Sequence, residues 1–126
     1  MTVGLSATQA AAILNIYRAT NITAPAAVYL KVHTGDPGAA GTSNASAETT
    51  RKALTFAAPS AGSSAASAVS WTSWSAGSET ITHVSIWDAS TSGNFLQSGA
   101  LAASKSVTNG DTLQVTVTAS LTPIAA

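Results

Sequence analysis

Strict alternation of apolar and polar residues is the feature that most constrains how this chain can fold. In "TLQVTVTASL", residues 112–121, every second side chain is apolar, and the positions between them carry Gln, Thr or Ser. A period of two is typical of a β-strand with one dry face and one hydroxyl-lined face. A run that begins at Ala26 has the same period, with one set of side chains expected toward the core (Val28, Leu30 and Val32) and the other away from it (Tyr29, Lys31 and His33).

Further short strands are expected along the chain, separated by polar turns. The candidates are "KALTFAA" from Lys52, "ASAVSWTSW" from Ala66, "TITHVSIWDA" from Thr80 and "GNFLQSGAL" from Gly93. Many short strands at close spacing indicate a mainly β fold, either an antiparallel β-sandwich or a small Greek-key barrel.

One turn signal is stronger than the others. The segment "TNGD", residues 108–111, contains Asn109 and Gly110, and an Asn–Gly pair favours a tight hairpin turn with positive φ. We therefore expect a hairpin between a strand that ends at Val107 and a strand that begins at Leu113.

A short amphipathic helix is predicted before the strands. Ser6 followed by Gln9 matches a capping box, and apolar side chains then recur at helical spacing, at Ala10, Ile13, Leu14 and Tyr17. The helix is expected to end near Asn21, because β-branched residues and Pro25 follow. We expect its apolar stripe to cover an open end of the protein's own core, and docking on a partner is the alternative.

The length of the chain indicates one domain over residues 1–126, with an N-terminal segment at 1–24 and a β-sandwich at 26–126. Because the sequence contains no cysteine, stability must come from packing and not from disulfides. No apolar run approaches the roughly 20 residues of a membrane-spanning helix, and the first residues lack the pattern of a signal peptide. We expect a soluble, unexported protein with no membrane partner.

Charged residues are scarce. They make up 8% of the chain, and the formal net charge is zero, whereas about 25% is usual. The basic residues are scattered and are offset by equal numbers of acids, which argues against a nucleic-acid partner: Arg18, Lys31, Arg51, Lys52 and Lys105. A surface of Ser, Thr and Gly costs less to desolvate than one of Lys and Glu, so the composition suits a protein packed against neighbouring molecules. Coding bias is the competing explanation.

The stretch "HTGDPG", residues 33–38, follows a predicted strand directly and invites a functional interpretation. His33 and Asp36 could supply half of a metal site or an acid–base pair. Asp36, Pro37 and Gly38 nevertheless have the chemistry of a turn, because Asp bonds its own backbone, Pro fixes φ and Gly tolerates positive φ. We predict a structural turn, followed by an exposed loop over residues 35–50 that is either a contact segment or flexible filler.

No catalytic, cofactor or metal site is predicted. His83, Ser85 and Asp88 are near one another in sequence, but residues 83 and 85 share one strand face while 88 lies on the other. Asp36, Asp88 and Asp111 each fall in or beside a turn, without the alternating acids of a calcium loop. A glycine-rich phosphate loop is also missing from the sequence. We expect a protein that is not an enzyme and takes no cofactor.

Three tryptophans, Trp71, Trp74 and Trp87, could stack on sugar rings if they shared an exposed face. Aromatic residues make up only 6% of the chain, so a core of this size needs its large side chains. We therefore expect at least two of the three tryptophans to be buried.

From about Tyr29 onward, the order of "HTGDPG", "ETTRKA", "THVSIWDA" and "GNFL" resembles small virion proteins of tailed phages that infect actinobacteria. Proteins of this group are minor structural components of the capsid surface or of the tail. The resemblance implies a non-enzymatic, β-rich assembly protein located in the virion, with no catalytic or cofactor residues.

Within this resemblance, a capsid decoration protein is the function we expect first. It would bind the outer shell as a homotrimer, with itself and the major capsid protein as partners, and the charge deficit favours such self-association. A minor tail or fibre-tip protein that contacts the host envelope is the alternative, although the sequence has no heptads or repeats. A carbohydrate-binding module is a third possibility, and exposed tryptophans would favour it.

Overall fold

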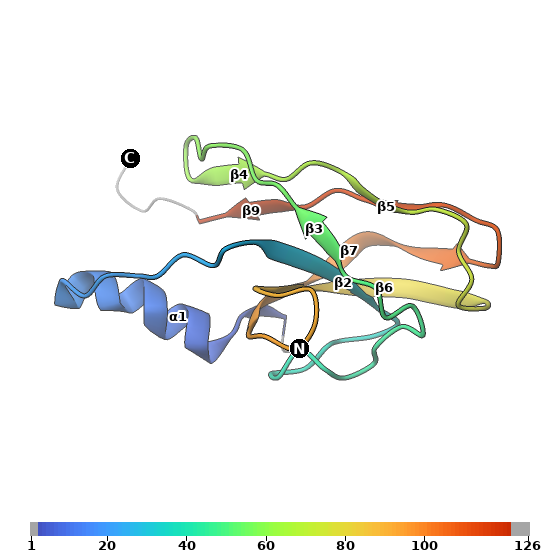
Figure 1. Cartoon of the computed structure of the whole chain (residues 1–126), viewed down its shortest axis with the longest axis horizontal. Coiled ribbons are helices and arrows are strands. Elements are labelled where there is room, and N and C mark those ends of the chain that lie inside the picture. Colours follow the sequence, from blue (N-terminus) through green and yellow to red (C-terminus); the bar gives the residue numbers. More distant parts are fainter. Residues whose placement is uncertain (1–2, 122–126) are drawn as a thin grey trace.

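Antiparallel β-strands dominate the structure, a computed structural model that describes residues 3–121 (Figure 1). A five-stranded sheet has the order β1–β7–β6–β2–β3, and its strands are β1 (Gly4–Leu5), β7 (Phe95–Val107), β6 (Glu79–Trp87), β2 (Val28–His33) and β3 (Lys52–Leu54). Two two-stranded ribbons form a second layer (Figure 1): β4 (Ser63–Ala65) with β9 (Thr118–Ser120), and β5 (Val69–Trp71) with β8 (Leu113–Val115). The prediction of a mainly β, antiparallel fold with one short N-terminal helix is confirmed.

The hydrophobic core lies between the two layers. On the large sheet, Leu30 pairs with Ile86 across β2 and β6, and Val32 pairs with Val84. The ribbons contribute the opposing side chains of the same buried cluster, Trp71, Leu113 and Val115. Full burial of each aliphatic side chain stabilises the fold by about 1.5–3 kcal/mol, so these pairs hold the layers together.

The second face of β2 is covered at its C-terminal end, so the expectation of one buried face is wrong at His33, while Tyr29 and Lys31 on the same face are half-buried. His33 is 0% exposed, although it points away from Leu30 and Val32. The segment after β2 folds back along its edge, where Thr34 N–H donates to the Asn44 carbonyl at 2.9 Å and Ser46 N–H donates to the Val32 carbonyl at 3.3 Å. It also covers His33, whose Nδ1 lies 2.9 Å from the Ser43 carbonyl oxygen. The loop predicted to be exposed over residues 35–50 is therefore packed in part.

The alternating run at 112–121 is divided between the two ribbons. Leu113 and Val115 of β8 are buried, whereas Leu121, just after β9, is 64% exposed. The alternation predicted the strand conformation correctly, but its apolar face is fully buried only in β8; Val117 is partly buried against the core, and burial is lost by Leu121.

The predicted hairpin at Asn109–Gly110 is wrong, although the turn exists. Asp111 N–H donates to the Thr108 carbonyl at 3.0 Å, and Gly110 has a φ of 96°. The two flanking strands do not pair with each other: β7 pairs with β6, and β8 pairs with β5. The turn connects β7 in the large sheet to β8 in the second layer. The Asn–Gly signal therefore identified the turn but not the strands with which β7 and β8 pair.

The N-terminal helix α1 (Ala7–Leu14) continues as a 3-10 helix, η1 (Asn15–Arg18). The cap at Ser6 is confirmed, since its hydroxyl accepts the Gln9 N–H at 3.0 Å. The Ser6 N–H donates to the Leu96 carbonyl of β7 at 2.8 Å and not to the Gln9 side chain, so the return half of the capping box does not form. Helical structure ends at Arg18, before the expected Asn21.

The expectation that the helix covers the protein's own core is also wrong. No residue of α1 or η1 is buried, and Tyr17 is 87% exposed. The cause is the anchoring of the segment before the helix: β1 pairs with β7 at Gly4–Ser98 and Leu5–Gln97. The helix therefore starts at the edge of the large sheet and projects beyond the layers (Figure 1).

Candidate interaction surface and the buried His33 network

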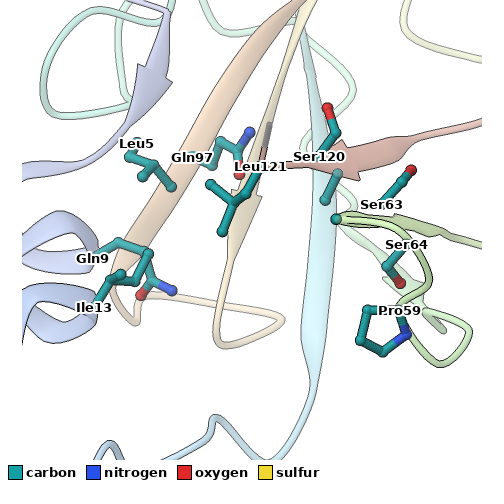
Figure 2. A pocket seen from close by; sticks show the side chains of 11 residues that line it. Leu5, Gln9, Ile13, Pro59, Ser63, Ser64, Gln97, Ser120 and Leu121 are labelled. Atoms are coloured by element: carbon teal, nitrogen blue, oxygen red, sulfur yellow. The ribbon is translucent and has the colours of Figure 1, made fainter. Parts of the chain in front are cut away.

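An apolar groove opens between α1 and the β4–β9 ribbon, with a volume of about 320 Å³ (Figure 2). One wall comes from the N-terminal segment, and the opposite wall comes from β4 and the chain before it. Figure 2 shows Leu121 and Gln97 between these walls. The residues that line the groove on its two sides are Leu5, Gln9 and Ile13, and Pro59, Ser63 and Ser64.

Large exposed hydrophobic side chains occur in the groove, at Leu5 and Leu121, and at the end of the helical segment that forms one of its walls. Leu14, Ile16 and Tyr17, here called the helix-end patch, are 61%, 59% and 87% exposed. Within residues 3–121, the other exposed large hydrophobic side chains are Leu121, at 64%, and the less exposed Leu5 and Ile22. Single exposed apolar residues are ordinary, but a concentration at one end of a domain marks an interaction surface.

His33 lies in a buried hydrogen-bond network that joins β2, β6 and the segment after β2. Its Nδ1 atom lies 2.9 Å from the Ser43 carbonyl oxygen, and its Nε2 atom lies 2.7 Å from Ser85 Oγ. The indole N–H of Trp87 donates to the same Ser85 oxygen at 2.8 Å. A neutral His33 with its proton on Nδ1 satisfies every group, because Nδ1–H donates to Ser43 and Nε2 accepts the Ser85 hydroxyl proton.

This network places a serine hydroxyl beside a histidine, yet it cannot act on a substrate. Both His33 and Ser85 are 0% exposed, and the Ser85 oxygen is already occupied by Trp87. Burial lowers the pKa of His33, and the nearby charge of Lys31 acts in the same direction. The neutral imidazole is therefore a structural hydrogen-bonding unit.

Sequence reasoning weighed His83 and not His33 as the neighbour of Ser85. The strand register explains the difference, since Ser85 lies opposite Lys31 and His33 lies opposite His83, which leaves His33 diagonal to Ser85 on one face. His83 Nδ1 instead lies 2.7 Å from the hydroxyl of Thr82. The strand register cannot be read from one sequence. The alternation of the two strand segments did place His33 and Ser85 on faces that point away from the predicted core, which is the one sequence signal of their contact.

The "HTGDPG" stretch is a structural turn, as predicted. The Asp36 carboxylate accepts the Gly38 N–H at 2.9 Å, and the Asn44 side chain donates to the Asp36 carbonyl at 2.8 Å. Asp36 thus stabilises the turn, while the His33 side chain is buried in a different hydrogen-bond network. The two residues therefore have separate structural roles.

The other two acids considered for calcium also hold their own turns. Asp88 accepts the backbone and side-chain N–H groups of Asn94, both at 2.7 Å, and these bonds lower its pKa. Asp111 accepts the Thr108 N–H at 2.9 Å. In the part of the chain that the structure describes, no three His, Cys, Asp or Glu residues are grouped so that they could hold a metal ion.

All three tryptophans are buried, which confirms that at least two are core residues. Trp71 and Trp74 are each 2% exposed, and Trp87 is 6% exposed. Their indole N–H groups are bonded within the protein, to the Thr50 carbonyl, the Gly77 carbonyl and Ser85 respectively. The tryptophans therefore form no exposed platform for a sugar ring.

The sequence model of one protein family, described as podophage GP4 fiber I protein gp80, matches residues 4–122. The chain belongs to this family. The match includes α1 and every described strand, from β1 to β9. Membership of the gp80 family confirms the broad expectation of a phage structural protein. A search of curated proteins gave no match. Across residues 3–121, no helix is long and apolar enough to cross a membrane.

Proposed function

We propose that the protein is a non-enzymatic structural component of a phage fibre. The observation that carries this proposal is the gp80 family match, which runs through nearly the whole chain and not through one motif. The fold is consistent with it, because the histidine, serine and tryptophan side chains that first suggested chemistry are hydrogen-bonded inside the protein. The exposed residues of the protein are mainly Ser, Thr and apolar residues such as Ala.

The partners we propose are further copies of the chain, arranged as a homotrimer, and neighbouring virion proteins. Charged residues make up 8% of the chain, so it has few charges to keep strand edges apart in solution. When several linked copies bind neighbouring sites on the virion, the complex dissociates far more slowly than a single copy would, so a modest interface per copy is sufficient. The family description names a fibre protein, which supports a place in a fibre; a position at the fibre tip, in contact with the host envelope, is the finer proposal.

Capsid decoration is the second candidate, with the major capsid protein as its partner. The small size and the low charge support it, because both suit a subunit packed on a repeating shell. The earlier resemblance to proteins of actinobacterial phages also includes capsid-surface components. A stand-alone carbohydrate-binding module has lost its main support, since the tryptophans that would carry it are buried.

Immunogold labelling of intact virions tests the proposal. An antibody raised against the purified protein should place gold at the tail or its fibres, and antibody absorbed with the purified protein should leave the particles unlabelled. Gold spread evenly over the shell would contradict the fibre proposal and favour capsid decoration. Particles that contain the protein by immunoblot but label only after disruption would contradict both, because each places the protein on the outside.

A further inference from the structure

We propose that the helix-end patch of one copy packs into the apolar groove of a second copy. The patch consists of Leu14, Ile16 and Tyr17, and the groove lies between α1 and the β4–β9 ribbon (Figure 2). The proposal concerns which surfaces meet, and it stands on this geometry whether the protein sits on a fibre or on a capsid.

The helix itself has little internal support. An isolated helix shorter than about 12 residues is marginal in water, and packing of an apolar face normally stabilises it. Here α1 has eight residues and η1 four, and none of them is buried. Only the half-buried Gln9 and Ile13 line the groove from the helix. The remaining apolar face needs a cover from outside the chain.

Patch and groove are continuous along the helix. Ile13 lines the groove, and Ile16 lies three residues further on, a spacing that places side chains on one face in an α-helix and in a 3-10 helix such as η1; Tyr17 follows directly. At the exposed fractions observed for Leu5, Leu14, Ile16, Tyr17, Ile22 and Leu121, this end offers on the order of 600 Å² of apolar surface. In one contact this surface is divided between the patch of one copy and the groove of the other, and a standard interface buries about 1,600 Å² over both partners. The apolar residues therefore form the centre of a modest interface, and the polar rim around them supplies the rest.

Charge favours a second copy over a different, charged partner. Residues 3–27 contain one charged side chain, Arg18, and its guanidinium donates to the Asn15 side chain at 3.2 Å. The residues that line the groove include no charged side chain. Nothing here matches a partner of opposite charge, whereas a projecting apolar patch and an apolar groove on the same chain complement each other. A head-to-tail contact of this kind closes into a ring when the rotation between copies permits it.

A charge placed in the patch tests this contact by sedimentation velocity. The unmodified protein should associate as its concentration rises. Tyr17→Asp should raise the dissociation constant by about tenfold or more, as expected for a central aromatic anchor. Thr72→Asp adds the same charge at an exposed residue after β5, away from the helix, and should leave association unchanged. A protein that remains monomeric at all concentrations, or equal effects of the two substitutions, would overturn the proposal.

Disulfide trapping distinguishes patch-in-groove packing from other contacts between copies. The natural chain has no cysteine, so each introduced thiol can be followed without background. A mixture of Tyr17→Cys and Ser63→Cys proteins should form a mixed disulfide dimer on mild oxidation, because Ser63 lines the groove. A mixture of Thr72→Cys and Ser63→Cys should not. Preferential dimers of Tyr17→Cys with itself would contradict the proposal, since they would indicate patch-to-patch packing.

Discussion

The Nε2 atom of His33 lies 2.7 Å from Ser85 Oγ, and neither side chain is exposed to solvent. This contact links β2 to β6 beyond their backbone pairing, and His33 Nδ1 extends it to the Ser43 carbonyl in the segment that covers the sheet. His33, which was weighed for an acid–base role, therefore attaches the segment after β2 to the sheet.

Removal of His33 should destabilise the fold. His33→Ala would leave the Ser43 carbonyl and the Ser85 hydroxyl without their partner and would open a cavity, so we expect a loss of about 2–4 kcal/mol in the free energy of unfolding. His83→Ala, at the paired but only half-buried position, is the control and should cost less. Urea denaturation measures both, and an unchanged midpoint for His33→Ala would refute the structural role.

Stability should fall at mildly acidic pH because of His33. Burial lowers its pKa in the folded state from the ordinary value of 6.5, so the unfolded chain binds the proton more readily. The stabilisation is therefore complete above about pH 6.5 and is lost as pH falls from there toward the folded-state pKa. Urea titrations at a series of pH values should show this loss for the natural protein and a flatter profile for His33→Gln. Parallel profiles for the two proteins would contradict the assignment.

Two glycines with positive φ should differ in their tolerance of a side chain. A Cβ at Gly41, φ 71°, would overlap the ring of Phe95, whereas a Cβ at Gly110, φ 96°, has no atom within 4 Å apart from its chain neighbours. Gly110→Ala should therefore cost only backbone strain of about 1 kcal/mol. Gly41→Ala adds the clash and should cost about 2 kcal/mol or more. Thermal denaturation compares them, and equal losses would argue against the packing of the 35–50 segment on Phe95.

The contact between Arg51 and Trp87 should tolerate lysine poorly. The guanidinium lies 4.0 Å from the Trp87 ring centroid and donates to the carbonyls of Ala89 and Ser92, both at 2.7 Å. A lysine keeps the charge but has no planar fork, so Arg51→Lys should destabilise the protein by about 1 kcal/mol. Lys105→Arg, at an exposed position, is a matched control expected to be neutral. A neutral Arg51→Lys in urea denaturation would show that the stacking contributes nothing.

The sequence predicted the parts of the fold that depend on local pattern. Alternation identified Leu30 and Val32 on β2 and Leu113 and Val115 on β8 as core residues, and Ser6 as the helix cap. These features depend on the direction of side chains along a strand and on hydrogen bonds between near neighbours in the chain, and both can be predicted from a local stretch of sequence.

Long-range pairing could not be predicted in the same way. Asn109 and Gly110 indicated a turn, but no local signal shows that β7 and β8 belong to different layers. The diagonal contact of His33 with Ser85 likewise depends on the register of β2 and β6. The stripe that ends in Leu14 and Tyr17 was recognised as apolar, but its exposure is set by where β1 anchors the helix.

The most direct test of the central claim is to find the protein in the virion. Purified particles can be dissociated into heads and tails, and the protein quantified in each fraction by mass spectrometry against an isotope-labelled standard. We predict that it co-purifies with intact virions in several copies per particle and partitions with the tail and fibre fraction. Its absence from purified virions, despite abundance in the infected-cell lysate, would contradict the assignment as a virion structural protein.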